Sequence, residues 1–197
     1  MLDNHRNWFG SIENKTADIF AGLPLTPNAY TATSVFAGLA MLYFLISGDY
    51  WLALAFFAAA GLLDLVDGAV ARRKKMSTNR GAYWDTIADR YVEAMFLFGL
   101  LFCELPDFHL PAAVWIFLSL FGSTMTTYAK AAAKEKGLCD AELKGGLMSR
   151  AERFFAYFLI LAAMISGNYH LAAVVIAILA VLANITAGQR ISAALRR

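Results

Sequence analysis

Six apolar stretches follow one another along the chain from residue 28, and short polar or turn-forming connections separate them. A membrane core of about 30 Å requires about 20 mostly apolar residues in a helical span. The third stretch carries acidic residues in its first half and is fully apolar only from Ala94 onward. The stretches cover residues 28–48, 51–71, 82–103, 112–129, 148–166 and 170–189. We therefore expect one all-α membrane domain over residues 1–197, in which residues 28–193 form a bundle of six transmembrane helices.

The segment before the first span, residues 1–25, has a different pattern, with large apolar residues at near-helical spacing among polar ones. These residues are Trp8, Phe9, Ile12, Ile19, Phe20 and Leu23. The segment has no unbroken apolar run of the kind that a cleavable signal peptide needs. The pattern predicts an amphipathic helix that lies in the cytoplasmic interface of the membrane. An amphipathic helix packed on protein would have the same pattern.

The composition agrees with a membrane protein. Apolar residues make up 59% of the 197 residues and charged residues 16%, whereas an average soluble domain has about 45–50% and about 25%. These fractions exclude a disordered or disulfide-stapled chain and disfavour a soluble enzyme. The net charge of +2 gives no indication of nucleic-acid binding. The six-span topology puts Cys103 and Cys139 on opposite sides of the membrane, so it excludes a disulfide between them.

The basic residues lie on one side of the predicted bundle. With six spans, both termini and the second and fourth connections share a side. Sixteen of the 17 Lys and Arg residues fall on that side or within a turn or so of it, and Arg90 lies about two turns inside the third stretch, counted from that same side. Because cytoplasmic loops are enriched in Lys and Arg, we expect a multi-pass protein of the cell membrane with both termini in the cytoplasm.

Four aspartates lie where the second span ends and the third begins. Asp64 and Asp67 are three residues apart, and Asp85 and Asp89 are four apart, so each pair shares one face of its helix. A carboxylate inside a membrane span costs about 2.5–3.5 kcal/mol, so its presence needs a reason. Hard divalent cations would neutralise the cluster, and Mg²⁺ or Mn²⁺ suits oxygen ligands. Two such ions could also clamp a phosphoryl group during in-line displacement.

Two glycines and one arginine accompany the aspartates. Gly68 and Gly81 would let a substrate approach the helices closely, although small residues in membrane helices also serve helix packing. Arg72 can pair with a phosphate, or it can mark the membrane interface together with the basic residues that follow it.

The spacing of these residues resembles the signature of the CDP-alcohol phosphotransferase family. The pattern in this chain reads Asp64-x2-Asp67-Gly68-x2-Ala71-Arg72-x8-Gly81-x3-Asp85-x3-Asp89. The resemblance implies a six-helix membrane fold, a homodimer and an active site at the cytoplasmic end of the bundle. It also implies the reaction, in which an alcohol displaces CMP from a CDP-linked lipid.

The resemblance further assigns roles to individual residues. Asp64, Asp67 and Asp85 would hold the metal ions with the help of a fourth aspartate. That residue, Asp89, would also take the proton of the acceptor hydroxyl. The residues at the CDP-lipid would be Asn28, Thr31, Gly68, Arg72, Thr78 and Gly81. The stretch from Pro27 to Thr31 could equally be an ordinary helix start.

The acceptor alcohol is the next question. Lys130, Arg150 and Arg190 stand at the ends of three different predicted helices, and this later pattern is similar to the family branch that makes phosphatidylinositol phosphate or its archaeal ether-lipid counterpart. The resemblance implies that the three cations bind the phosphate of inositol phosphate. From spacing alone they could be plain positive-inside charge. Glycerol phosphate would also suit such a site, and serine would not need three cations.

One alternative comes from another functional class. Acidic residues within spans, next to basic loops, could form the pathway of a divalent-cation transporter. The acids cluster at one end of the predicted bundle and no inverted repeat is visible, so an enzyme is favoured. Arg90 and Glu93 receive no catalytic role here. We expect Arg90 to pair with an acid or with lipid phosphate, and Glu93 to support the site or to accept a hydrogen bond from a neighbouring helix.

Overall fold

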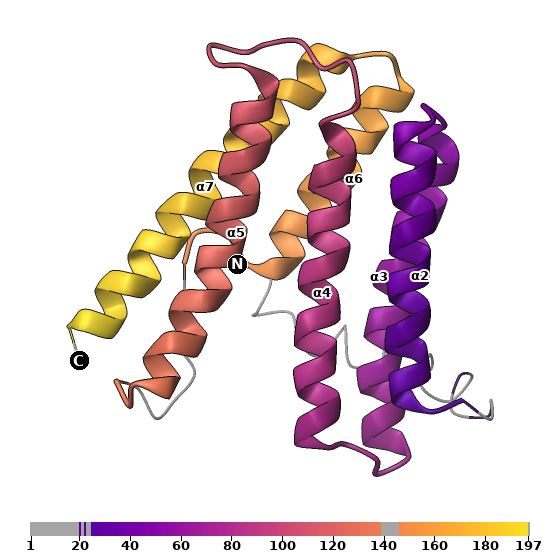
Figure 1. Ribbon diagram of the computed structural model, residues 1–197, viewed down its shortest axis with the longest axis vertical. Helices are drawn as coiled ribbons and strands as arrows, with labels where there is room; N and C mark the ends of the chain where they lie inside the picture. The colour runs from indigo at the N-terminus through magenta and orange to yellow at the C-terminus, as the bar shows by residue number, and fades with distance from the viewer. Residues whose placement is uncertain (1–19, 21, 23–24, 139–145, 197) are drawn as a thin grey trace. The chain divides into compact units, whose positions relative to one another are not determined.

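The computed structural model describes residues 20, 22, 25–138 and 146–196 (Figure 1). Its named elements are six α-helices: α2 (Pro27–Ile46), α3 (Tyr50–Arg73), α4 (Asn79–Leu100), α5 (Ala112–Glu135), α6 (Arg150–Ile165) and α7 (Tyr169–Leu195). Each predicted apolar stretch coincides with one of these helices, so the all-α prediction is confirmed for the described part of the chain. The predicted interfacial helix, residues 1–25, lies almost entirely outside the described residues, as does Cys139.

Four of these helices are long and apolar enough to cross a membrane, namely α2, α3, α5 and α7. The other two differ from the expectation for physical reasons. Helix α6 has 16 residues, which at 1.5 Å per residue gives about 24 Å, less than the hydrocarbon core of about 30 Å. Helix α4 carries Arg80, Asp85, Asp89 and Arg90 in its first half. A membrane span by each of these two helices stays a prediction.

Large apolar side chains point outward from several helices. Phe36 on α2 is 69% exposed, Leu65 on α3 66% and Phe117 on α5 63%. Exposed apolar surface of this extent is unfavourable in water and is typical of a surface that another apolar phase covers. Together with the four long apolar helices, it identifies the chain as a membrane protein.

The chain divides into two compact units, residues 1–96 and residues 97–197. In the first unit α2 packs along α3, and Tyr30 joins Val66 and Val70 in a buried cluster. The first part of α4 belongs to the same unit. A Cβ on Gly38 of α2 would lie 3.1 Å from the Val92 side chain of α4, so a glycine allows these two helices to approach closely.

In the second unit α7 packs against both α5 and α6. Hydrogen bonds cross the α5–α7 contact at several levels: the Ser119 hydroxyl donates to the Ile176 carbonyl at 3.3 Å, and the Asn184 amide donates to the Leu118 carbonyl at 2.9 Å. Where neighbouring lipid tails are as apolar as the side chains, close packing and such hydrogen bonds hold helices together.

At Gly122 the backbone of α5 lies close to α7. A Cβ at this position would lie 2.7 Å from Asn184 Nδ2 and 2.8 Å from the Asn184 backbone nitrogen. We expect Gly122→Ala to destabilise the protein by about 1–3 kcal/mol, because overpacking forces the backbones apart. The measurement is thermal unfolding in detergent. Gly188→Ala on α7 is the matched control, because its added methyl group would meet nothing within 4 Å; equal melting temperatures for the two variants would contradict the close contact.

Candidate active site

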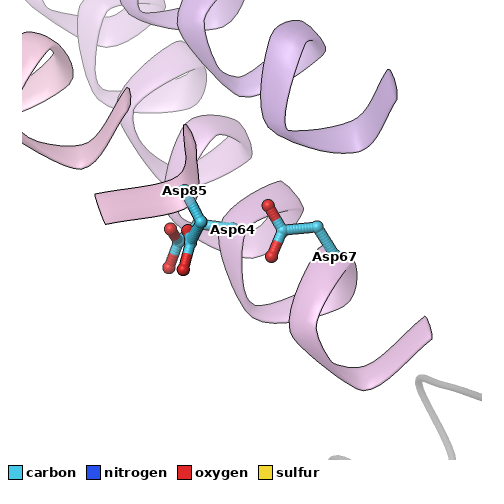
Figure 2. Close-up of side chains that lie close together, drawn as sticks. All are labelled: Asp64, Asp67 and Asp85. Carbon is cyan, nitrogen blue, oxygen red and sulfur yellow. The ribbon is translucent and has the colours of Figure 1, made fainter. Parts of the chain in front are cut away.

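Three carboxylates from two helices lie together in the first unit. Asp64 and Asp67 extend from α3, and Asp85 extends from α4 (Figure 2). Each offers one oxygen atom, and these three atoms all lie within 4.8 Å of one another. We call these three residues the aspartate triad. Asp67 is buried and only 4% exposed, whereas Asp64 and Asp85 are partly buried.

Local geometry explains why the aspartate triad forms. On α3 the spacing of three residues puts Asp64 and Asp67 on adjacent turns of one face. The five residues 74–78 connect α3 to α4, so the two helices run in opposite directions and the start of α4 returns beside the end of α3 (Figure 1). Lys75 takes the left-handed conformation in this connection, with φ of 54°. The Met76 N–H donates to the Ala71 carbonyl at 2.9 Å, which ends α3 sharply.

A threonine from a third helix holds the most buried carboxylate. The Thr31 hydroxyl of α2 donates to Asp67 Oδ2 at 2.5 Å, and both groups are buried. This hydroxyl also lies 3.2 Å from the Pro27 carbonyl, but the shorter distance to a carboxylate identifies Asp67 as its main acceptor. From the sequence we expected Thr31 at the CDP-lipid. The hydrogen bond to Asp67 could not be predicted, because a contact between residues 36 positions apart leaves no periodic pattern in the sequence.

The aspartate triad has the donor set of a site for a hard divalent cation. Its ligands are oxygens only, which Mg²⁺ and Mn²⁺ prefer over softer donors. Carboxylates this close together repel one another, and a divalent ion removes that repulsion. The triad therefore fits the predicted metal, and three of the four predicted ligands lie together.

The fourth predicted ligand, Asp89, is not part of the aspartate triad. It lies four residues after Asp85 on α4, which places it about 6 Å further along the helix axis. Its Oδ2 is 3.9 Å from Arg90 Nη2, and Arg90 Nη1 is 2.5 Å from Glu93 Oε2. Arg90 thus pairs with acids of its own helix, which is the first of the two partners that we expected for it.

A cavity of about 180 Å³ opens beside the aspartate triad. Asp67 and Asp85 line it, together with residues from the start of α2, the end of α3 and the start of α4. All six residues that the sequence assigned to a CDP-lipid line the same cavity: Asn28, Thr31, Gly68, Arg72, Thr78 and Gly81. Met76 and Ser77 also line it and were not predicted, because they belong to a connection that has no helical periodicity.

The two glycines of the cavity lie against polar side chains. The Arg72 guanidinium covers Gly68, where an added Cβ would lie 3.4 Å from Nη1. An added Cβ on Gly81 would lie 3.2 Å from Thr78 Oγ1 and 3.4 Å from Asn28 Oδ1. The Thr78 hydroxyl also accepts a hydrogen bond from the Gly81 N–H at 3.0 Å, so it caps the start of α4.

The three cations predicted for the acceptor belong to the second unit. Lys130 lies near the end of α5, Arg150 is the first residue of α6 and Arg190 lies in the last turns of α7. Arg150 is exposed, and the other two are partly buried. Arg190 Nη1 donates to the Thr126 carbonyl of α5 at 2.9 Å. This carbonyl lies one helical turn before Lys130.

The Thr31–Asp67 hydrogen bond leads to a testable expectation. Thr31→Val keeps the shape of the side chain and removes the donor, and loss of a hydrogen-bond partner that orients a metal ligand typically costs about 10–100-fold in metal affinity. We expect a Mn²⁺ affinity about 10-fold weaker, measured by titration of the purified protein with Mn²⁺. Thr33→Val is the control, because the Thr33 hydroxyl bonds only within α2, to the Ala29 carbonyl at 2.8 Å. Equal affinities for both variants would contradict a role of Thr31 in the metal site.

Comparison with known proteins identifies similar sequences. A family model described as CDP-alcohol phosphatidyltransferase matches residues 24–186. The chain is 29% identical over 183 residues to an archaetidylinositol phosphate synthase of Pyrococcus horikoshii, covering 90% of this chain and 87% of that protein. It is 37% identical over 99 residues to a bifunctional IPC transferase and DIPP synthase of Aquifex aeolicus, but this match spans 48% of the chain and only 23% of that longer protein.

Solved structures give a consistent result. The fold is similar to that of Mycobacterium tuberculosis phosphatidylinositol phosphate synthase, with a TM-score of 0.78 and 25% sequence identity. The structure of that protein with CDP-DAG bound matches over 93% of this chain and 94% of that chain. A second structure of it, in complex with manganese and citrate, matches over 93% of this chain and 88% of that chain.

Proposed function

The chain belongs to the CDP-alcohol phosphatidyltransferase family, a family of phospholipid-synthesising transferases, and we propose that it transfers the lipid phosphate of a CDP-linked lipid to the hydroxyl of inositol phosphate. The donor is CDP-diacylglycerol or CDP-archaeol, and the products are CMP and phosphatidyl- or archaetidylinositol phosphate. One observation carries the proposal: two members of the aspartate triad and all six residues expected at the CDP-lipid line one cavity.

The chemistry is a displacement at phosphorus. The acceptor oxygen forms a bond to the phosphorus that carries the lipid, and the bond from that phosphorus to the CMP oxygen breaks. Asp89 takes the proton of the acceptor hydroxyl, and CMP leaves with the electron pair of the broken bond. The aspartate triad would hold two Mg²⁺ or Mn²⁺ ions with the help of Asp89. When bound, these ions neutralise charge on the phosphoryl oxygens.

The cavity of the first unit suits a nucleoside diphosphate. The Arg72 guanidinium supplies a fixed positive charge for the diphosphate, and it lies over Gly68 beside the cavity. Asn28 and Thr78 supply polar groups around Gly81, where the absence of a side chain lets the ligand approach the start of α4. A helix start also carries partial positive charge, which favours a bound phosphate.

Three cations of the second unit suit a phosphorylated acceptor. Lys130, Arg150 and Arg190 come from three helices, and Arg–phosphate pairs are strong because two N–H groups bind two oxygens at once. The name of the Pyrococcus relative supports inositol phosphate as the acceptor. Glycerol phosphate is the alternative with the same charge, and serine is the alternative without it. Family membership favours all of these over a divalent-cation transporter.

The proposal includes a place in the cell. The enzyme is a multi-pass protein of the cell membrane with both termini and the active site on the cytoplasmic side, as the distribution of Lys and Arg indicates. It works as a homodimer, as the family resemblance implies. Protease accessibility of the termini in inverted vesicles and cross-linking in the membrane are the respective measurements.

The experiment that tests the function is CMP release by the detergent-purified protein with CDP-lipid and Mg²⁺. Inositol phosphate, glycerol phosphate, serine and inositol are offered in parallel, with EDTA as the control. We expect release that requires the metal and inositol phosphate. Release with a different alcohol would contradict the acceptor and leave the transferase reaction. Absence of release with every alcohol would contradict the proposed function as a whole.

A further inference from the structure

The short segment 146–149, which leads into α6, is bound to the end of α7. The Met148 N–H donates to Thr186 Oγ1 at 3.0 Å, and the Leu147 N–H donates to Gln189 Oε1 at 3.1 Å. Thr186 is fully buried. Gly146 has a φ of 115°, and an added Cβ there would collide with the Thr186 side chain. The segment can take this course only because it begins with a glycine.

The same segment ends at a residue of the proposed acceptor site. Ser149 caps α6, and Arg150 is the first residue of that helix. The Glu152 carboxylate accepts a hydrogen bond from the Ser149 N–H at 2.6 Å. Three consecutive N–H groups, at residues 147, 148 and 149, therefore each donate to a side-chain oxygen. The backbone that leads to Arg150 is fixed by side chains rather than by a regular element.

The helix that binds this segment also contacts α5. Gln189 and Arg190 lie three and four residues after Thr186, so the three residues share one face near the end of α7. Arg190 donates to the Thr126 carbonyl of α5, one turn before Lys130. One face of α7 thus supplies one of the three cations and contacts the two chain segments that carry the other two.

We propose that Thr186 and Gln189 are positioning residues, which fix Arg150 relative to Arg190 and thereby set the affinity of the enzyme for the phosphate of its acceptor. This inference rests on the proposed function, since it takes the acceptor to be a phosphorylated alcohol. Binding of a phosphate by two N–H groups of one arginine depends on the position of the guanidinium. A binding site that is about 1 Å too loose, because the residues that support it are missing, can lose its function. The Arg150 side chain is exposed, and the segment 146–149 sets the position from which it extends.

The test compares substitutions at both residues with the wild-type enzyme. Thr186→Val keeps the shape of the side chain and removes the acceptor of the Met148 N–H, and Gln189→Leu removes the acceptor of the Leu147 N–H. For each variant we expect the KM for inositol phosphate to rise about 2–12-fold, since loss of one hydrogen bond costs about 0.5–1.5 kcal/mol and each 1.4 kcal/mol is tenfold. The KM for CDP-lipid and the kcat at saturating acceptor should stay within about twofold. Thr186→Ser keeps the hydroxyl and should restore the wild-type KM.

A matched control separates positioning from general packing. Ser119 is also fully buried in the α5–α7 contact, and its hydroxyl donates across that contact to Ile176. Ser119→Ala removes a buried hydrogen bond without touching segment 146–149, so both KM values should be unchanged. Amide hydrogen exchange in the full-length protein supplies a readout that is independent of activity: exchange at Met148 should accelerate in Thr186→Val and not in Ser119→Ala.

The outcomes are distinguishable from those of the proposed function. Equal changes in both KM values, or an unchanged KM for inositol phosphate in Thr186→Val, would overturn the positioning role. If the wild-type protein released no CMP with inositol phosphate, the proposed function would fail separately. The positioning role is then decided by binding of inorganic phosphate, measured as thermal stabilisation of the wild-type protein and of Thr186→Val. Weaker binding by the variant would support it, and equal binding would overturn it.

Discussion

Asp67→Asn is expected to lower metal-dependent CMP release by about 10³-fold, because a divalent ion supplies several kcal/mol of transition-state stabilisation and each 1.36 kcal/mol is tenfold in rate. Asp67 is the most buried member of the aspartate triad and receives the Thr31 hydrogen bond at 2.5 Å. Asparagine has the same shape, and its amide oxygen can still accept that hydrogen bond. The substitution therefore removes the charge of one metal ligand while it preserves the packing around it.

The loss should appear in metal binding as well as in turnover. We expect the Mn²⁺ affinity of Asp67→Asn to be at least about 10-fold weaker than that of the wild-type protein, because loss of a residue that only orients a metal ligand already costs about 10–100-fold. Asp49→Asn is the matched control on the same helix. Asp49 caps the start of α3 by accepting a hydrogen bond from the Leu52 N–H at 3.1 Å, and asparagine caps a helix equally well. Wild-type turnover by Asp67→Asn would remove the aspartate triad as the metal site.

The aspartate triad could be predicted because its geometry is mostly local. The spacing of Asp64 and Asp67 alone puts them on one face of a helix. A connection of five residues then leaves little freedom in how α4 returns beside α3, so Asp85 faces them. The residues of the cavity followed from the same register and from the family resemblance. Asp89 was expected in the same cluster, but a further turn of α4 separates it from the aspartate triad.

Contacts between distant segments could not be predicted in this way. The Thr31–Asp67 bond and the bonds from segment 146–149 to Thr186 and Gln189 join residues about 36–42 positions apart. Such bonds depend on the register between helices, which hydrophobic periodicity does not encode. The length of α6 was overestimated for a related reason: Met148 is bound to Thr186 of α7 and Ser149 caps the helix, so α6 begins only at Arg150.

Asp89→Asn is expected to lower turnover by about 10²–10⁴-fold, the usual contribution of a positioned general base, while metal-dependent binding of CDP-lipid persists. The structure gives a reason to expect this separation. Asp89 lies outside the aspartate triad, so the three carboxylates that remain can still bind a divalent ion. Its carboxylate is partly buried beside Arg90, with 3.9 Å between the charged groups. Asparagine keeps this shape but cannot take a proton from the acceptor hydroxyl.

Glu93→Gln shows whether such a loss is specific to Asp89. Glu93 lies one turn further along α4, is buried and accepts from Arg90 at 2.5 Å. Neutralisation of Glu93 removes an acidic charge from the same helix and breaks its ion pair with Arg90, so we expect a lower melting temperature. Turnover should stay within about 10-fold of wild type, because Glu93 is not the general base. CMP release and Mn²⁺-dependent binding of CDP-lipid are measured for both variants. If Asp89→Asn kept wild-type turnover, or lost CDP-lipid binding and turnover in equal measure, Asp89 would not be the base. The first result would place proton transfer elsewhere, and the second would make Asp89 a ligand of the metal alone.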